Sequence, residues 1–219
     1  MDAGEMLMPE EFDAHCADGT LRLAFIGMSN GGKSYRSRIL HQEADFLWYH
    51  VDEEIQKALG FADMAQISAW LGYPSDARYP EHEQRYLELE DRFTQNASMQ
   101  TNGHNLVFDT TGSVVHLTPD TLAILQQNCL VVHLDVGEDS LRQMTERFFA
   151  NPKPVAWCGY YEERPGDSAE SALRRSYPTL LRERLARYRE LAHMTIPASE
   201  LRDATARETL VIIKNRLAK

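Results

Sequence analysis

A lysine followed by a serine closes a stretch rich in glycine, and these residue types at this spacing are suited to binding phosphate. The stretch from Gly27 to Ser34 reads GMSNGGKS and fits the pattern GxxxxGK[ST] at every fixed position. Glycines let backbone N–H groups turn toward an anion, and the helix expected after Lys33 adds the positive end of its dipole. The motif predicts a nucleotide-binding P-loop. We expect the phosphates of ATP to contact Gly27, Asn30, Gly31, Gly32, Lys33, Ser34 and Tyr35.

Aspartates end several apolar segments, and a carboxylate near the P-loop serine commonly completes a Mg²⁺ site. Asp109 ends the run NLVF and is the first candidate to bind the metal together with Ser34. Asp52 ends the run FLWYHV, and its position directly before a helix also suits an N-cap. Asp135 ranks third, because the residues after it indicate a turn.

These residues lie between short apolar segments that alternate with helical ones. Strands are predicted at 21–26, 46–51, 105–108, 129–136 and 194–196. Helices are predicted at 33–42, 53–59, 64–71, 80–99, 139–150, 179–192 and 205–217, with a further helix that begins near Thr118. This alternation predicts an α/β fold with a parallel sheet covered on both faces, whose ligands bind at the carboxyl ends of the strands.

The ends of the chain and one long irregular segment complete the organisation. Residues 1–20 are expected to be a lead-in, loose or helical, before a single domain at 21–219. Residues 151–172 hold three prolines and two glycines, and a loop of this length in a compact domain is usually functional. We expect a lid at about 151–176.

Composition narrows the class of protein. Of the 219 residues, 43% are apolar, which is enough for a core and excludes a disordered chain. The net charge of −10 argues against binding to a nucleic-acid backbone. No apolar run is long enough to span a membrane, the first residues lack the pattern of a signal peptide, and three scattered cysteines suggest a reducing compartment. We therefore expect a cytoplasmic protein without a membrane partner.

With these residues in place, the chain resembles the shikimate kinase group of small P-loop kinases. The resemblance is strongest at the P-loop and covers most of residues 21–198. The family carries Asp-x-Asp-x-x-Ile after its second strand, where this chain has His50-Val-Asp52-Glu-Glu-Ile. The resemblance implies that Asp52 contacts the hydroxyl groups of the acceptor. His50 replaces the acid that holds Mg²⁺ through water, so Asp109 is expected to take that role.

The resemblance also assigns groups to the acceptor site and the lid. The family's glycine triplet is reduced to Gly112 in the sequence DTTGS, and its late arginine matches Arg184, four positions before Tyr188. Arg184 also falls on the inward stripe of its helix, where a guanidinium needs an anionic partner, either a substrate or a protein carboxylate. The family's mid-chain arginine is replaced by Pro80, so Arg78 or Arg85 could substitute for it, although neither matches residue for residue. Lys153, followed by a proline, is the nearest match to the arginine at the start of the lid.

The expected fold is a P-loop sheet of five parallel strands in the order 2-3-1-4-5, with helices on both faces. The expected activity is transfer of phosphate from ATP, with Mg²⁺, to a hydroxyl of a small and anionic metabolite. In this mechanism Lys33 neutralises developing charge and Asp52 orients or deprotonates the acceptor. A kinase for a sugar or nucleoside, a regulatory P-loop protein without efficient turnover, and an NTP hydrolase are the alternatives. The sequence does not indicate an oligomeric state.

Overall fold

Five parallel strands form the centre of the computed structural model, which describes residues 7–100 and 103–218. The strand order is β2-β3-β1-β4-β5, which confirms the predicted topology. The first six residues of the expected lead-in lie outside the described residues. The strands are β1 (Arg22–Ile26), β2 (Leu47–His50), β3 (Leu106–Asp109), β4 (Leu130–Asp135) and β5 (Met194–Pro197).

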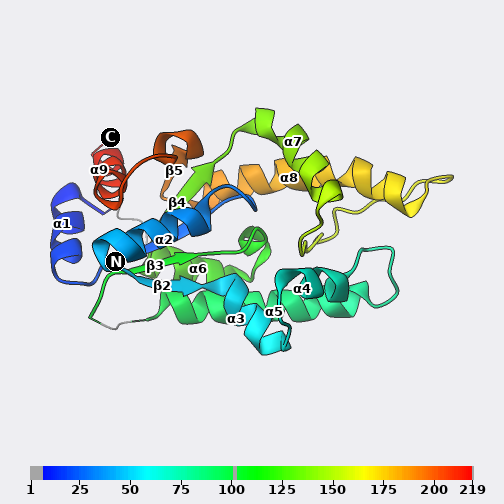
Figure 1. The fold of residues 1–219 in the computed structure, drawn as a ribbon, viewed down its shortest axis with the longest axis horizontal. Helices are drawn as coiled ribbons and strands as arrows, with labels where there is room; N and C mark the ends of the chain where they lie inside the picture. Colours follow the sequence, from blue (N-terminus) through cyan, green and yellow to red (C-terminus); the bar gives the residue numbers. More distant parts are fainter. Residues whose placement is uncertain (1–6, 101–102, 219) are drawn as a thin grey trace.

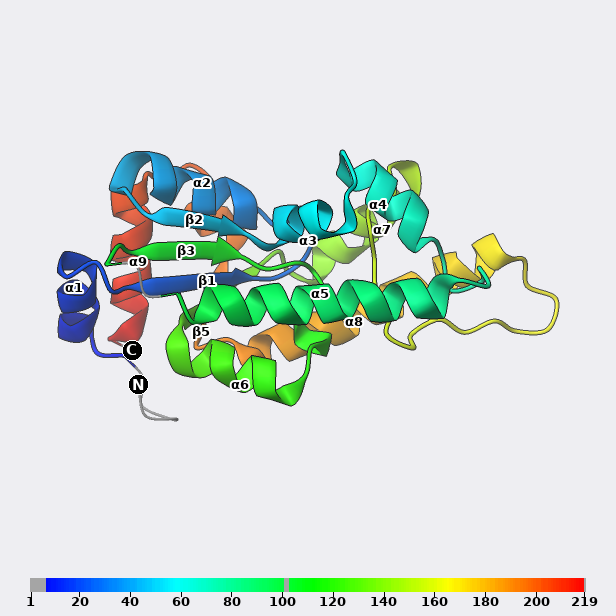
Figure 2. The same ribbon diagram turned by 90° about the horizontal axis from the view of Figure 1, so that it is seen from below.

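Helices connect the strands and cover both faces of the sheet (Figure 1). The α-helices are α1 (Pro9–Ala17), α2 (Lys33–Ala44), α3 (Val51–Leu59), α4 (Met64–Leu71), α5 (Tyr79–Ser98), α6 (Pro119–Asn128), α7 (Leu141–Ala150), α8 (Ala169–Leu191) and α9 (Ala206–Leu217). Short 3-10 helices lie at Val114–His116, Glu138–Ser140 and Ala198–Leu201. Figure 2 shows the strand arrows pointing toward the end of the sheet where α3, α4 and α7 stand.

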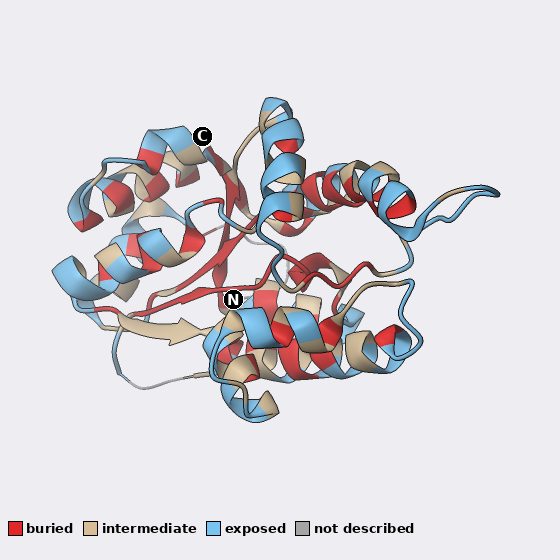
Figure 3. Cartoon of the chain, turned by 45° about the vertical axis from the view of Figure 1, so that its right-hand side comes forward, coloured by how far each residue is buried: buried red, intermediate tan, exposed pale blue. Residues whose placement is uncertain are grey.

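The two faces of the sheet are packed into separate hydrophobic cores, because side chains alternate along each strand. In β1, Leu23 and Phe25 face the core that contains α1, α2 and α9. Ala24 and Ile26 face the larger core, which contains α5, α6 and α8. Figure 3 shows that the strands are mostly buried, whereas the edge strand β2 is only half-buried.

Helix α8 begins at Ala169, so the predicted start at Thr179 is wrong. Pro178 lies inside this helix, although proline removes a backbone hydrogen bond and commonly ends or kinks a helix. Tyr177, Leu180 and Leu181 are buried on either side of the proline, and this burial offsets its cost. The irregular segment therefore ends at residue 168, and Ser168 caps the helix with its side chain.

In the described residues, no helix is both long enough and apolar enough to cross a membrane.

Candidate active site

The P-loop connects β1 to α2 and has the conformation that its glycines allow. Gly27 has φ +136°, and a Cβ there would lie 2.8 Å from the carbonyl oxygen of Leu134 on the neighbouring strand. Lys33 is buried, and its ammonium donates hydrogen bonds to the carbonyls of Gly27 at 2.8 Å and Met28 at 3.0 Å. Burial lowers the pKa of Lys33, against the nearby carboxylates, which raise it. The loop thus holds its own cation close to where phosphate oxygens bind.

Sheet register brings the predicted metal ligands together. Parallel pairing places His50 of β2 opposite Asp109 of β3, at the ends of both strands. The buried carboxylate of Asp109 accepts a hydrogen bond from Ser34 Oγ at 2.5 Å and one from Trp48 Nε1 at 2.6 Å. His50 Nε2 lies 3.2 Å from the same carboxylate. Three neighbours therefore fix the orientation of Asp109.

His50 also caps helix α3. Its Nδ1 accepts a hydrogen bond from the backbone N–H of Glu53 at 3.2 Å, which leaves Nε2 to face Asp109. The alternative that Asp52 is the N-cap is therefore wrong, and Asp52 lies in the first turn of the helix. The imidazole thus contacts Asp109 in the place where the resemblance predicts an acid.

The donor set near the P-loop is compatible with Mg²⁺. Ser34 and Asp109 offer hard oxygen ligands that already face each other. Across residues 7–100 and 103–218 no cluster of three or more acidic, histidine or cysteine side chains could hold a metal by itself. Mg²⁺ keeps several waters and binds substrate phosphates in such sites, so two protein oxygens are sufficient.

A cavity of about 440 Å³ beside the P-loop brings most of the predicted catalytic and acceptor residues together. Lys33, Asp52, Gly112, Lys153 and Arg184 all line it. Burial raises the pKa of Asp52, and the carboxylate of Asp109 raises it further, whereas His50 and Lys33 lower it. A carboxylate with a raised pKa is a better proton acceptor, as general-base work requires.

Arg184 lies on the buried face of α8, as the helical stripe predicts, with 4% of its surface exposed. Its guanidinium donates to the carbonyl of Ala156 at 2.6 Å and contacts His116 Nε2 at 3.4 Å. Burial lowers the pKa of His116 to about 3, and Arg184 lowers it as well, so this imidazole is neutral and can accept. Within the described chain, no carboxylate forms an ion pair with Arg184.

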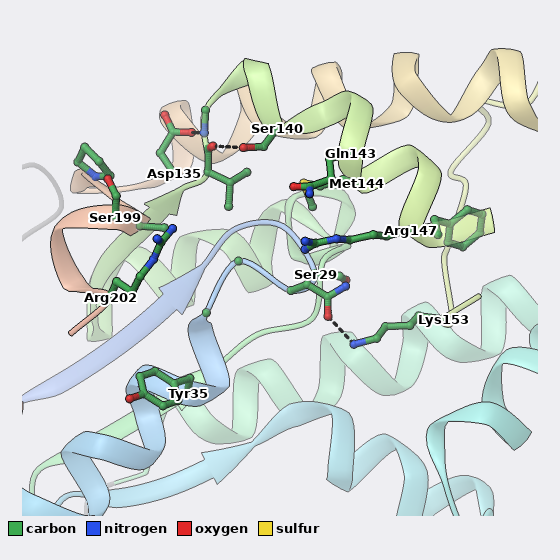
Figure 4. Close-up of a pocket in the computed structure, with 18 of the residues that line it drawn as sticks. Ser29, Tyr35, Asp135, Ser140, Gln143, Met144, Arg147, Lys153, Ser199 and Arg202 are labelled. Atoms are coloured by element: carbon green, nitrogen blue, oxygen red, sulfur yellow. Dashed lines mark hydrogen bonds between the residues drawn. The ribbon is translucent and has the colours of Figure 1, made fainter. Parts of the chain in front are cut away.

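A second cavity, of about 820 Å³, lies on the other side of the P-loop (Figure 4). It is lined by Tyr35, by residues after β4 and β5, and by α7. In Figure 4, Arg147 and Lys153 extend toward the loop that carries Ser29. Lys153 Nζ donates to Asn30 Oδ1 at 2.7 Å, so the start of the expected lid contacts the P-loop directly.

Two further candidate residues from the sequence do not line the smaller cavity with the catalytic and acceptor residues. Arg78 is exposed at the beginning of α5 and lines neither cavity, so the structure does not bring it to the acceptor residues. Asp135 uses one carboxylate oxygen to bind the N–H of Gly137 at 2.7 Å and the other to pair with Arg189 at 3.2 Å. Asp135 therefore stabilises the turn after β4, as the residues that follow it in the sequence indicate.

Sequence reasoning missed three residues near the site. Trp48 of β2 donates a hydrogen bond to Asp109. Tyr86 lines the smaller cavity, and Glu90 is buried behind the residues that follow Asp109. A signal for Glu90 was present, because an acid lies on the apolar stripe of α5 with Tyr86 and Leu89.

The fold and the P-loop define a small P-loop phosphotransferase. The family model for shikimate kinase matches residues 29–214, and the chain belongs to the shikimate kinase family. It is a small-molecule kinase that transfers phosphate from ATP to a hydroxyl group. No curated protein sequence matches the chain.

Solved structures have the same fold. A shikimate kinase from Acinetobacter baumannii in complex with shikimate has a TM-score of 0.64 and 21% identity, covering 95% of this chain and 99% of its own. A shikimate kinase from Bacteroides thetaiotaomicron has a TM-score of 0.60 and 16% identity, covering 91% and 99%. One from Aquifex aeolicus has a TM-score of 0.56 and 19% identity, covering 90% and 98%.

Proposed function

We propose that the acceptor is a small hydroxylated carboxylate. The observation that carries this proposal is the guanidinium of Arg184, which is buried, has no carboxylate partner among the described residues, and lines the same cavity as Lys33 and Asp52. A buried guanidinium is costly without an anion, and it binds a carboxylate through two parallel hydrogen bonds. Shikimate, bound in the Acinetobacter baumannii neighbour, is a molecule of this class.

The two cavities suggest how the substrates divide the site. ATP would occupy the larger cavity with its phosphates on the P-loop, and the acceptor would occupy the smaller one. Both cavities include Ser29, Asn30, Gly32 and Lys153, so the two substrates would meet at the loop. Asp52 would accept the proton of the attacking hydroxyl, and Lys33 and Lys153 would bind the charge that develops on the transferred group.

Ser34 and Asp109 would hold Mg²⁺, which supplies charge neutralisation for the phosphates when it is bound. His50 and Trp48 keep the Asp109 carboxylate turned toward Ser34. Asp109 replaces the missing acid of the family at this point of the sheet. The role of these side chains is therefore to present two oxygens in a fixed orientation.

The test is a screen of ATP consumption against hydroxylated carboxylates, beginning with shikimate, alongside neutral polyols, sugars and nucleosides. Arg184→Ala should weaken binding of the acceptor by about 10- to 150-fold, the value of a charged hydrogen bond of about 1.5–3 kcal/mol. Arg182→Ala is the matched control, because Arg182 is exposed on the same helix. A neutral acceptor whose KM ignores the Arg184 substitution would contradict the proposal.

A further inference from the structure

Glu90 is a completely buried carboxylate of α5, and within the described chain no lysine or arginine forms an ion pair with it. Two hydroxyls bind it instead. Thr111 Oγ1 donates to Oε1, and Ser113 Oγ donates to Oε2 at 2.5 Å. We propose that Glu90 is a positioning residue, which holds the turn at residues 111–113 in the shape that the acceptor binds. This proposal rests on the proposed function, since it concerns the same acceptor cavity.

The turn is fixed from two helices. Within it, Thr111 Oγ1 accepts a hydrogen bond from the backbone N–H of Ser113 at 3.0 Å. The carbonyl of Gly112, at its centre, accepts from the hydroxyl of Tyr188 on α8 at 2.5 Å. Glu90 therefore binds both ends of the turn from α5, and Tyr188 binds its middle from α8.

A displacement of this turn would directly change the shape of the smaller cavity. A Cβ on Gly112 would lie 3.0 Å from Ser29 Oγ of the P-loop and 3.4 Å from a terminal nitrogen of Arg184. The whole turn lines the smaller cavity, together with Asp52. The backbone of the turn thus fills the space between the P-loop and Arg184. A small movement of the turn would alter the surroundings of both.

The hydrogen bonds favour the ionised form of Glu90. Both neighbouring hydroxyls donate, and a protonated carboxyl would have to use one oxygen as a donor, which breaks this pattern. Burial raises the pKa of Glu90 to about 7, the hydroxyls of Ser113 and Thr111 lower it, Asp52 raises it and Arg184 lowers it. The charged and titratable groups around the carboxylate are Lys33, Asp52, Tyr86, Cys158, Arg184 and Tyr188.

Steady-state kinetics with shikimate and ATP as probes separate positioning from charge. Removing the negative charge alone would favour an anionic acceptor, because the charge of Glu90 would no longer repel it. Displacement of the turn would instead weaken binding of the acceptor. We expect Glu90→Gln to raise the KM for shikimate about tenfold, equivalent to about 1.4 kcal/mol, while the KM for ATP stays within about twofold.

Glu88→Gln is the matched control, because Glu88 is exposed on the same helix, where it pairs with Arg85 at 3.6 Å and accepts a hydrogen bond from Gln84 at 3.0 Å. This variant should leave both KM values unchanged. An unchanged or lower KM for shikimate in Glu90→Gln would overturn the proposal.

Backbone NMR of the ligand-free protein tests the coupling without any acceptor. The amide signals of Gly112 and Ser113 should shift together with a midpoint of about pH 7 in the wild type, and stay constant in Glu90→Gln. Ser113→Ala removes one hydroxyl only and should move the midpoint to higher pH. Signals that titrate equally in wild type and Glu90→Gln would also overturn the proposal. A wild type that phosphorylates no hydroxylated carboxylate would defeat the proposed function, while this titration still decides the role of Glu90.

Discussion

Glu90 should make the stability of the folded chain depend on pH in an unusual direction. Its pKa is raised by burial from an ordinary 4.5 to about 7. Between these values the folded state keeps a proton that the unfolded chain releases. The stabilisation from protonated Glu90 is therefore complete below about pH 4.5 and is lost as the pH rises through about 7.

The size of the effect follows from the two pKa values. A difference of about 2.5 units corresponds to about 3 kcal/mol of unfolding free energy, at 1.36 kcal/mol per unit. The part that falls between pH 5 and pH 8 is about 2.5 kcal/mol. No reduction for solvent screening is needed, because the side chain is completely buried.

Urea unfolding of the wild type and Glu90→Gln at pH 5 and pH 8 measures this quantity. The glutamine does not titrate, so the stability of the variant relative to the wild type should improve by about 2.5 kcal/mol from pH 5 to pH 8. Taking the change with pH cancels any constant cost of the substitution. Glu88→Gln should show no such change. If the difference between Glu90→Gln and wild type is the same at both pH values, the reasoning about a buried carboxylate without a cation is wrong.

Three further predictions concern the phosphate site. Lys33→Ala should greatly weaken ATP binding or make it unproductive, which calorimetry and turnover assays check; a wild type that gives no heat with ATP or ADP would contradict this. Asp109→Asn should raise the Mg²⁺ concentration needed for activity, and if Asp52→Asn shifts it instead, the wrong carboxylate has been assigned. Lys153→Met should lower kcat by about 100-fold if its ammonium binds developing charge, with ATP affinity by calorimetry as the check that binding persists.

Much of the fold and the phosphate site could be predicted because their signals are local. The P-loop motif is contiguous, and strand order followed once the strand ends and the family resemblance were recognised. The proximity of Asp109 to Ser34 also follows from topology, since neighbouring parallel strands end at the same edge of the sheet. These features require no knowledge of side-chain packing.

The missed residues depend on contacts between distant segments. The indole N–H of Trp48 donates to Asp109 on the next strand. Glu90 contacts Thr111 and Ser113 across the space between α5 and β3, which no spacing rule reports. The start of α8 was missed because Pro178 normally interrupts a helix, and only the burial of its neighbours shows why this helix continues.

The beginning of α5, where the family has its mid-chain arginine, has a structural role in this chain. Tyr79 accepts a hydrogen bond from the backbone N–H of Trp157 at 2.7 Å, and Glu83 accepts one from that of Cys158 at 2.8 Å. These bonds tie α5 to the buried segment that follows Lys153 and that lines the acceptor cavity at Val155.

That same segment supplies the carbonyl of Ala156, which holds the guanidinium of Arg184. In place of a second arginine, the chain thus has this buried backbone segment, which orients Arg184. A guanidinium that is already ordered loses less side-chain entropy on binding, about 0.5–1.5 kcal/mol for a side chain of this kind. One pre-oriented arginine suits an acceptor with a single anionic group, because the other cations of the cavity, Lys33 and Lys153, are those that would bind the transferred phosphate.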